Sequence, residues 1–139
     1  MKTGFTASTF DLLHTGHILM LREARTVCDY LIVGLQTDPT IDRPNKNKPI
    51  QSVFERYVQL QACTYVDEII VYATEKDLLD ILLSYPIDIR ILGSEYKNTV
   101  FTGSGLGMAC YFNKRAHSFS TTELRSRIKL TDNIKGTKK

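Results

Sequence analysis

Cysteine, proline and glycine are scarce in this sequence, and long apolar runs are missing. The three cysteines (Cys28, Cys63 and Cys110) are odd in number, lie far apart and form no CxxC pair. This pattern argues against a disulfide framework and against a zinc site. No apolar run approaches the ~18 residues of a membrane span, and residues 1–6 lack the apolar stretch that a signal peptide needs. We therefore expect a cytoplasmic protein without a membrane span.

The chain has 139 residues, of which 42% are hydrophobic and 24% charged, as is typical of one globular domain. Its net charge of +3 is unevenly distributed. Residues 114–139 hold eight lysines and arginines against two acidic residues (net +6), whereas residues 1–113 hold ten against thirteen (net −3). A basic end on an acidic body indicates an anionic ligand or partner, and a solvated tail is the alternative. We expect a folded domain over residues 1–130 and a polar, basic tail over 131–139.

Strand and helix patterns alternate along the chain. The continuous apolar run at 30–35 is typical of a strand that is buried on both faces of a parallel sheet. Ser52 followed by Glu55 predicts a capping box at the start of a helix. We expect strands at 4–9, 30–35, 66–72, 87–92 and 108–112, and helices at 17–27, 52–64, 77–84 and 122–130. This alternation, with short connections, predicts a single doubly wound parallel α/β sheet, a Rossmann-like arrangement.

In such a sheet, ligands bind where the strands end and the helices begin. The segments to search are therefore 8–17, 36–49, 93–105 and 113–122. In the first of them, His14 and His17 flank Gly16 between a predicted strand and a predicted helix. Incidental surface histidines and a metal site are the alternatives, although no third ligand stands nearby. The interpretation that we favour is phosphate binding, because a helix N-terminus offers free N–H groups and two imidazoles add hydrogen-bond donors.

Segment 113–122 offers a second helix N-terminus at which an anion could bind. Ser120, Thr121 and Thr122 open the predicted final helix, and Arg115 stands five positions before them. Small hydroxyl residues at a helix start are also typical of a plain N-cap. Together with the arginine they predict a second anion site.

Several motifs resemble those of one known family. The segment 9–17 (TFDLLHTGH) resembles the signature of the HxGH nucleotidyltransferase superfamily, and within it that of the small glycerol-3-phosphate cytidylyltransferases. Segment 48–56 (KPIQSVFER) is similar to the family's lysine-bearing loop and the helix start that follows. Segment 65–69 (YVDEI) is similar to its Y-V-D-E-V strand, and 115–122 to its closing element. The resemblance keeps order and approximate spacing over about residues 4–128, and it implies a nucleotidyltransferase fold.

The resemblance also implies roles for the matching residues. Thr9, Phe10 and Gly16 would line the nucleotide site, and His14 and His17 would contact the triphosphate and stabilise the transition state at the α-phosphorus. Further implied nucleotide contacts are Lys46 and Lys48 on a mobile loop, Glu95 near the nucleoside, and Arg115 with Ser120, Thr121 and Thr122 at the β- and γ-phosphates. His14, His17, Lys48 and Arg115 are the predicted catalytic residues.

Two residues keep open interpretations. Asp11 either orients the motif through structural hydrogen bonds or contacts the substrate, and Arg56 either forms a helix–strand ion pair or contacts the substrate. The sequence also departs from the family pattern, because Ser8 replaces a glycine and Gly93-Ser94-Glu95-Tyr96 stands where an acidic pair is usual. Because of these departures, the resemblance does not fix which base the nucleotide carries or which acceptor is used.

The predicted function is transfer of CMP from CTP to a phosphorylated small alcohol, with glycerol 3-phosphate fitting best and pyrophosphate leaving. The alternative is an adenylyltransferase of the same superfamily that acts on a sugar phosphate or a flavin precursor, so the expected nucleotide is CTP or another nucleoside triphosphate. A non-catalytic nucleotide- or RNA-binding protein is a third hypothesis, against which no nucleic-acid motif is found. Mg²⁺ is expected with the triphosphate, without a dedicated protein metal site. The resemblance implies a homodimer, and no nucleic-acid partner is expected.

Overall fold

One five-stranded sheet, in the order β3-β2-β1-β4-β5, forms the centre of the protein, and all its strands are parallel. The computed structural model describes residues 1–114 and 117–137, with side chains described as far as residue 132. The strands are β1 (Thr3–Ser8), β2 (Tyr30–Gln36), β3 (Glu68–Tyr72), β4 (Ile89–Leu92) and β5 (Cys110–Phe112). The helices are α1 (Thr15–Ala24), α2 (Val53–Gln61), α3 (Glu75–Ser84) and α4 (Thr121–Thr137), with short 3-10 turns at Ser94–Tyr96 and Ser104–Leu106. The predicted doubly wound parallel sheet is confirmed.

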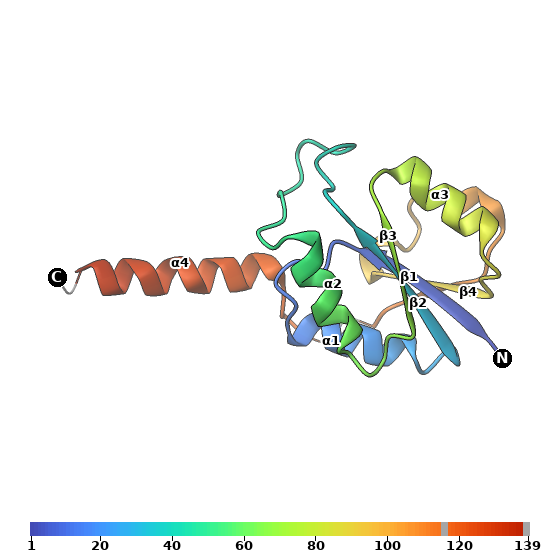
Figure 1. Cartoon of the computed structure of the whole chain (residues 1–139), viewed down its shortest axis with the longest axis horizontal. Helices are drawn as coiled ribbons and strands as arrows, with labels where there is room; N and C mark the ends of the chain where they lie inside the picture. The colour runs from blue at the N-terminus through green and yellow to red at the C-terminus, as the bar shows by residue number, and fades with distance from the viewer. Residues whose placement is uncertain (115–116, 138–139) are drawn as a thin grey trace.

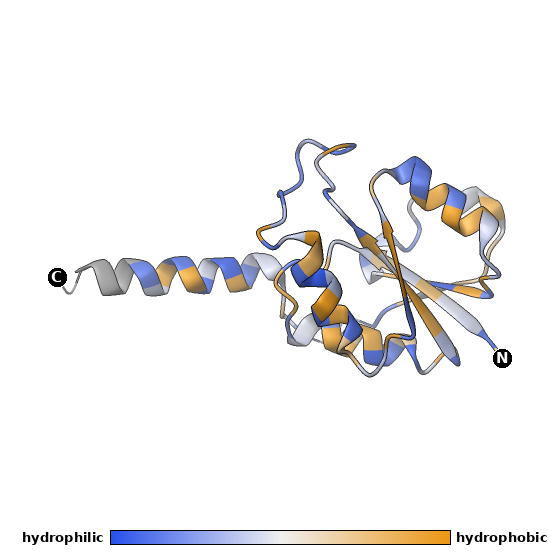
Figure 2. Cartoon of the chain, in the orientation of Figure 1, coloured by the Kyte–Doolittle hydropathy of each residue, from blue (hydrophilic) through white to orange (hydrophobic). Residues whose placement is uncertain are grey.

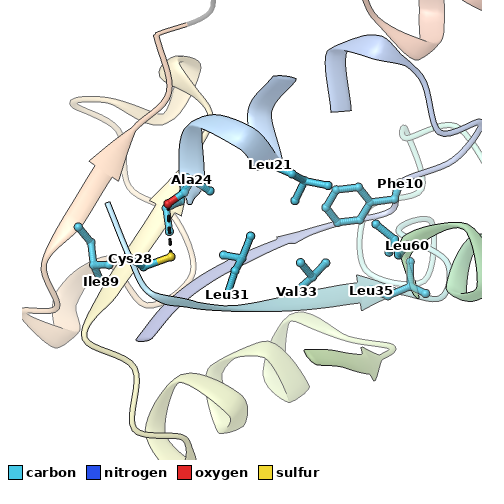
Figure 3. Packing of buried hydrophobic residues seen from close by; sticks show 10 residues of the cluster. Phe10, Leu21, Ala24, Cys28, Leu31, Val33, Leu35, Leu60 and Ile89 are labelled. Carbon is cyan, nitrogen blue, oxygen red and sulfur yellow. Dashed lines mark hydrogen bonds between the residues drawn. The ribbon is translucent and has the colours of Figure 1, made fainter. Parts of the chain in front are cut away.

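Helices cover both faces of the sheet (Figure 1). On one face, Leu21 of α1 and Leu60 of α2 pack against Leu31, Val33 and Leu35 of β2 (Figure 3). On the other face, the apolar cluster consists of Phe5, Ile32, Tyr72, Leu78, Ile81 and Leu82, which brings α3 against β1, β2 and β3. Figure 2 shows hydrophobic residues on the strands and on the helix sides that meet them. Successive residues of β2 serve opposite faces, which explains its unbroken apolar sequence.

Most helices begin and end within a few residues of the predicted positions. The capping box at Ser52 and Glu55 is present. Helix α3 begins before the predicted residue 77 because the Thr74 side chain accepts from the Asp77 N–H and the Asp77 carboxylate accepts from the Thr74 N–H. Helix α1 begins two residues early because His14 caps it.

Helix α4 differs most from the prediction. It runs to Thr137, so residues 131–137 continue the helix where a separate polar tail was expected. No proline or glycine stands between residues 121 and 135 to stop it. Beyond its first turns the helix projects away from the body (Figure 1). None of the helices in the described ranges is long and apolar enough to cross a bilayer.

The Arg56 side chain connects several segments at the carboxyl edge of the sheet. It is 2% exposed. Its Nη1 donates to the carbonyl oxygens of Thr9 (2.9 Å) and Gln36 (2.7 Å), and its Nη2 donates to that of Thr37 (2.8 Å). Its Nε donates to the carbonyl oxygens at the start of α2. The guanidinium thus fixes the end of β1, the end of β2 and the start of α2 relative to one another.

Arg56→Met should therefore destabilise the protein strongly, because it leaves buried carbonyl oxygens without donors. Each orphaned buried group costs ~1–3 kcal/mol, so we expect a loss of at least ~3 kcal/mol in the free energy of unfolding, measured by urea denaturation. Arg56→Lys should recover only part of that loss, since one ammonium cannot span carbonyls in three directions. The control is Arg127→Met at an exposed arginine of α4, expected to stay within ~0.5 kcal/mol of the wild type. Equal stabilities of the Arg56→Met and Arg127→Met proteins would contradict this role.

Candidate active site

A cavity of about 1030 Å³ lies at the carboxyl edge of the sheet, where α1 and α4 begin. All four segments that the sequence singled out contribute residues to its lining. The site is thus found where a doubly wound sheet is expected to bind ligands.

The two histidines of the HxGH motif form the N-terminal cap of α1. His14 Nδ1 accepts a hydrogen bond from the Gly16 N–H at 2.9 Å, and His17 Nδ1 accepts one from the His14 N–H at 3.1 Å. The two ring centroids lie 4.0 Å apart. Since both Nδ1 atoms accept, the neutral rings carry their protons on Nε2. The local fold therefore sets two neighbouring imidazoles as Nε2–H donors.

Thr121 connects this cap to the start of α4. Its hydroxyl donates to the Asp11 carbonyl oxygen at 3.2 Å, and His14 Nε2 lies 3.3 Å from the same hydroxyl oxygen. Because His14 Nε2 carries the proton, the ring donates to Thr121. The N-termini of α1 and α4 consequently meet at one place, and both present their positive dipole ends there.

His17 is kept neutral by its surroundings. The pKa of His17 is lowered from 6.5 to about 3, chiefly by burial and also by the nearby His14, while Asp11 opposes both effects in part. The ring also lies against Phe10, with centroids 5.5 Å apart. At neutral pH, His17 therefore acts as a hydrogen-bond donor and carries no charge.

Asp11 anchors the neighbouring segments to the motif. Its carboxylate is 6% exposed and accepts from the backbone N–H groups of Ile50 and Gln51, both at 2.9 Å, and from Arg125 Nη2 at 2.8 Å. Burial alone would raise the pKa of Asp11, but these three donors outweigh it and hold that pKa below its usual value. Of the two interpretations of Asp11, these contacts are those of the orienting one. The ion pair suggested for Arg56 is not found among the described residues: Arg56 donates to backbone carbonyl oxygens instead.

The space around Gly16 has no room for a side chain. A Cβ atom there would lie 2.7 Å from the His14 ring and 3.0 Å from the Phe119 carbonyl oxygen. Any side chain at this position would push the His14 ring out of its capping geometry. The close approach of α1 to the segment before α4 is a second reason for glycine, beyond room for a phosphate.

Most of the other predicted site residues line the main cavity. Thr9, Phe10, Lys46, Glu95, Ser120, Thr121 and Thr122 all line the cavity together with the histidines. Phe10 is also a core residue, 1% exposed (Figure 3). Ser120 accepts from the Glu123 N–H at 3.0 Å, as an N-cap does.

Lys48 lies apart from the main cavity. Its side chain is 80% exposed, and it lines a separate depression of about 410 Å³ with Asp38, whose carboxylate is 4.0 Å from its ammonium. In this conformation of the loop, Lys46 and not Lys48 faces the site. Arg115 falls outside the described residues, and its predicted role stays a prediction.

Sequence reasoning did not assign several cavity residues to the site. Arg125 pairs with Asp11 because it stands one helical turn after Thr121 on α4, and that i, i+4 spacing was a usable signal. Gln36, Tyr72, Glu75, Arg90 and Phe101 line the part of the cavity beside α3. No motif marks these five residues, which meet only through the strand order.

Within the described ranges, no group of three histidine, cysteine or acidic side chains could hold a metal ion.

The pKa of His17 predicts how stability depends on pH. The folded value of about 3 lies below the unfolded value of 6.5, so the unfolded chain binds the extra proton between them. Stability should therefore be complete above about pH 6.5 and fall as the pH drops through that window. Below about pH 6, wild type should lose ~1.4 kcal/mol per pH unit more than His17→Gln. Urea unfolding at pH 7.5, 6 and 5 measures both slopes, and parallel curves would count against the neutral, buried ring.

Comparison with known proteins identifies the family. A model of the cytidylyltransferase-like family matches residues 5–127. The bifunctional protein HldE of Campylobacter jejuni (strain RM1221) is 33% identical over 129 residues, and that of Helicobacter pylori (strain HPAG1) is 34% identical over 133 residues. These matches cover 92% and 95% of this chain but 28% of each relative, so the chain spans little more than a quarter of their length.

Solved structures agree on the fold. A lipopolysaccharide core biosynthesis protein from Thermoplasma volcanium GSS1 superposes with a TM-score of 0.60 at 25% identity, covering 95% of this chain and 89% of that one. A bifunctional NMN adenylyltransferase/ADP ribose pyrophosphatase from Francisella tularensis superposes with a TM-score of 0.59 at 16% identity, over 91% of this chain and 41% of that one. Since the family model spans most of the chain and relatives above 30% identity cover more than nine-tenths of it, the protein belongs to the cytidylyltransferase-like family of nucleotidyltransferases.

Proposed function

We propose that this chain transfers a nucleoside monophosphate from a nucleoside triphosphate to the phosphate of a small phosphorylated alcohol, with release of pyrophosphate. One observation carries the proposal. The cap of α1 sets His14 and His17 side by side as neutral Nε2–H donors at a helix N-terminus that opens into the cavity. Such donors stabilise charge that develops on phosphoryl oxygens during transfer.

The reaction needs no proton transfer. An oxygen of the acceptor phosphate, already an anion at neutral pH, attacks the α-phosphorus in line. The bond from that phosphorus to the bridging oxygen of the β-phosphate breaks, and pyrophosphate leaves with the bond electrons. Catalysis is then positioning together with stabilisation of charge.

The residues at the site divide this work. His17 would donate its Nε2–H to an oxygen of the α-phosphate as that phosphorus becomes pentacovalent. His14 would do the same once its Nε2–H turns from the Thr121 hydroxyl to the ligand. Before the ligand binds, the Thr121 hydroxyl holds the His14 ring. Ser120 and Thr122, which line the cavity at the start of α4, would bind the β- and γ-phosphates. Mg²⁺ that arrives with the triphosphate would neutralise charge on the leaving pyrophosphate.

CTP is the first candidate donor, because the matching family model is cytidylyltransferase-like, and glycerol 3-phosphate is the first acceptor to test. Adenylyl transfer to a sugar phosphate is the second candidate. The segment Gly93-Ser94-Glu95-Tyr96 stands where the resembled cytidylyltransferases have an acidic pair. The Thermoplasma structure is described as a lipopolysaccharide core biosynthesis protein, which supports a sugar acceptor. A homodimer stays part of the proposal on the family resemblance alone.

Pyrophosphate release tests both candidates directly. The chain should release pyrophosphate with one nucleoside triphosphate far faster than with the other three, in the presence of Mg²⁺ and a phosphorylated acceptor. Glycerol 3-phosphate, sugar 1-phosphates and a flavin precursor form the acceptor panel. Turnover with ATP alone would replace the CTP assignment, and no release with any pair would overturn the proposed function.

Substitution of the histidines separates catalysis from capping. Asparagine is a good N-cap but cannot place an N–H where His14 Nε2 lies, so His14→Asn should keep the fold and lose roughly 10²–10³ in kcat. His17→Ala should lose a comparable factor. Ser52→Ala removes the cap of α2 and serves as the control, with a small loss of stability and unchanged kcat. Near wild-type turnover of His14→Asn would exclude His14 as a transition-state donor.

A further inference from the structure

Arg90 stands on the face of the sheet that packs against α3. It pairs with Phe5 of β1 on one side and with Cys110 of β5 on the other. Phe5 belongs to the apolar cluster beneath α3, and Ile32 continues the same row on β2. In this cross-strand row, β2 and β1 contribute the apolar side chains of Ile32 and Phe5, and β4 contributes the arginine.

The guanidinium of Arg90 is buried and has few protein partners. The residue is 6% exposed, Nη1 donates to the Thr102 carbonyl oxygen, and Cζ lies 5.2 Å from the centroid of the Phe101 ring. Among the side chains that the structure describes, no carboxylate lies within 4.0 Å of it. Burial lowers the pKa of Arg90, and nearby groups such as Cys110, Tyr72 and Glu75 oppose this effect, so the group stays a cation at neutral pH.

Arg90 also lines the cavity, together with Phe101 and Thr102. We call this part of the cavity the α3-side lobe, formed by Gln36, Tyr72, Glu75, Leu78, Arg90 and Phe101. Arg43 at its rim is neutralised, because its Nη2 lies 3.3 Å from the Glu75 carboxylate. Arg90 is the cation of the lobe that lines the cavity and forms no ion pair with a carboxylate in the described part of the chain.

A buried cation without a carboxylate in direct contact is costly, because it has lost most of its water and the opposite charge of Glu75 acts on it only from beyond 4.0 Å. Its fork of N–H donors matches two oxygens of a carboxylate or a phosphate. We propose that Arg90 selects the acceptor by binding a second oxyanion, carried at the end of the acceptor opposite the phosphate that attacks. This inference rests on the proposed function and names the acceptor class as a small phosphorylated compound with a second carboxylate or phosphate.

The geometry of β4 sets the scale of the acceptor. Arg90 stands two residues before Leu92, where β4 ends, which places its Cα roughly 7 Å below the edge that carries the HxGH cap. Acceptors of about three to six carbons are therefore suitable probes. Matched pairs that differ only at the far end test the second charge: 3-phosphoglycerate against glycerol 3-phosphate, and 6-phosphogluconate against glucitol 6-phosphate. Glucitol 1,6-bisphosphate distinguishes a phosphate from a carboxylate at that end.

The experiment measures kcat/KM for each acceptor with the nucleotide that supports pyrophosphate release. Wild type should prefer the doubly anionic member of at least one pair by about 10- to 100-fold, the usual effect of a charge-assisted hydrogen bond. Arg90→Met should reduce that ratio to near one while leaving KM for the nucleotide unchanged. Should Arg90→Met fail to fold, Arg90→Lys keeps the charge without the fork and should lower the ratio by an intermediate factor.

Arg25→Met is the matched control. It removes an arginine and its ion pair with Asp67 after α1, away from the cavity, and should leave the acceptor ratio at the wild-type value. If Arg90 only tied the 101–102 segment to β4, its variants would lower stability and slow all acceptors alike, which would overturn the proposal.

Calorimetric titration of the same acceptors, without nucleotide, separates this proposal from the proposed function. Turnover with equal kcat/KM for both members of each pair overturns the role of Arg90 and leaves nucleotidyl transfer standing. Absence of turnover with tighter binding of the doubly anionic acceptors, lost in Arg90→Met, overturns the transfer and supports the role of Arg90. Absence of turnover with equal binding overturns both.

Discussion

The hydrogen bonds from Arg56 to backbone carbonyl oxygens are the constraint on which the site depends. They join the end of β1, the end of β2 and the start of α2 through one buried side chain. Carbonyl oxygens at the ends of parallel strands have no further strand partner, and burial would leave them without donors. One planar guanidinium satisfies several of them and thereby fixes the chain just before the HxGH motif.

From that fixed point, the histidines are placed by local hydrogen bonds and the rest of the site by long-range ones. His14 and His17 orient each other within a single helical cap. Asp11 then reaches Ile50 and Gln51 on the loop before α2 and Arg125 on α4. A carboxylate held by three donors ties to the same motif a loop 39 and 40 residues away and a helix residue 114 residues away, so loop and helix both enclose the end of the cavity at the histidines.

The cavity combines two electrostatic environments. At the end of the cavity with His14 and His17, imidazoles and helix N-termini supply hydrogen bonds and dipoles without a buried formal charge on His17. At the α3-side lobe, Arg90 supplies a buried formal charge. The first arrangement suits a charge that spreads during the reaction, and the second suits a charge that the ligand already carries.

The sequence by itself determined the alternation of strands and helices, the place of the HxGH motif before α1 and the start of α4, because each depends on residues within a few positions of one another. Periodicity and capping residues such as Ser52 are local signals. The partners of Arg56 and Arg125, the distance of Lys48 from the main cavity and the exposure of Arg90 to it were decided only by the tertiary structure. Those contacts join residues that are distant along the chain, and the strand order β3-β2-β1-β4-β5 brings them together. No spacing in the sequence encodes which strands become neighbours, since parallel pairing depends on how crossover helices pack over the whole sheet.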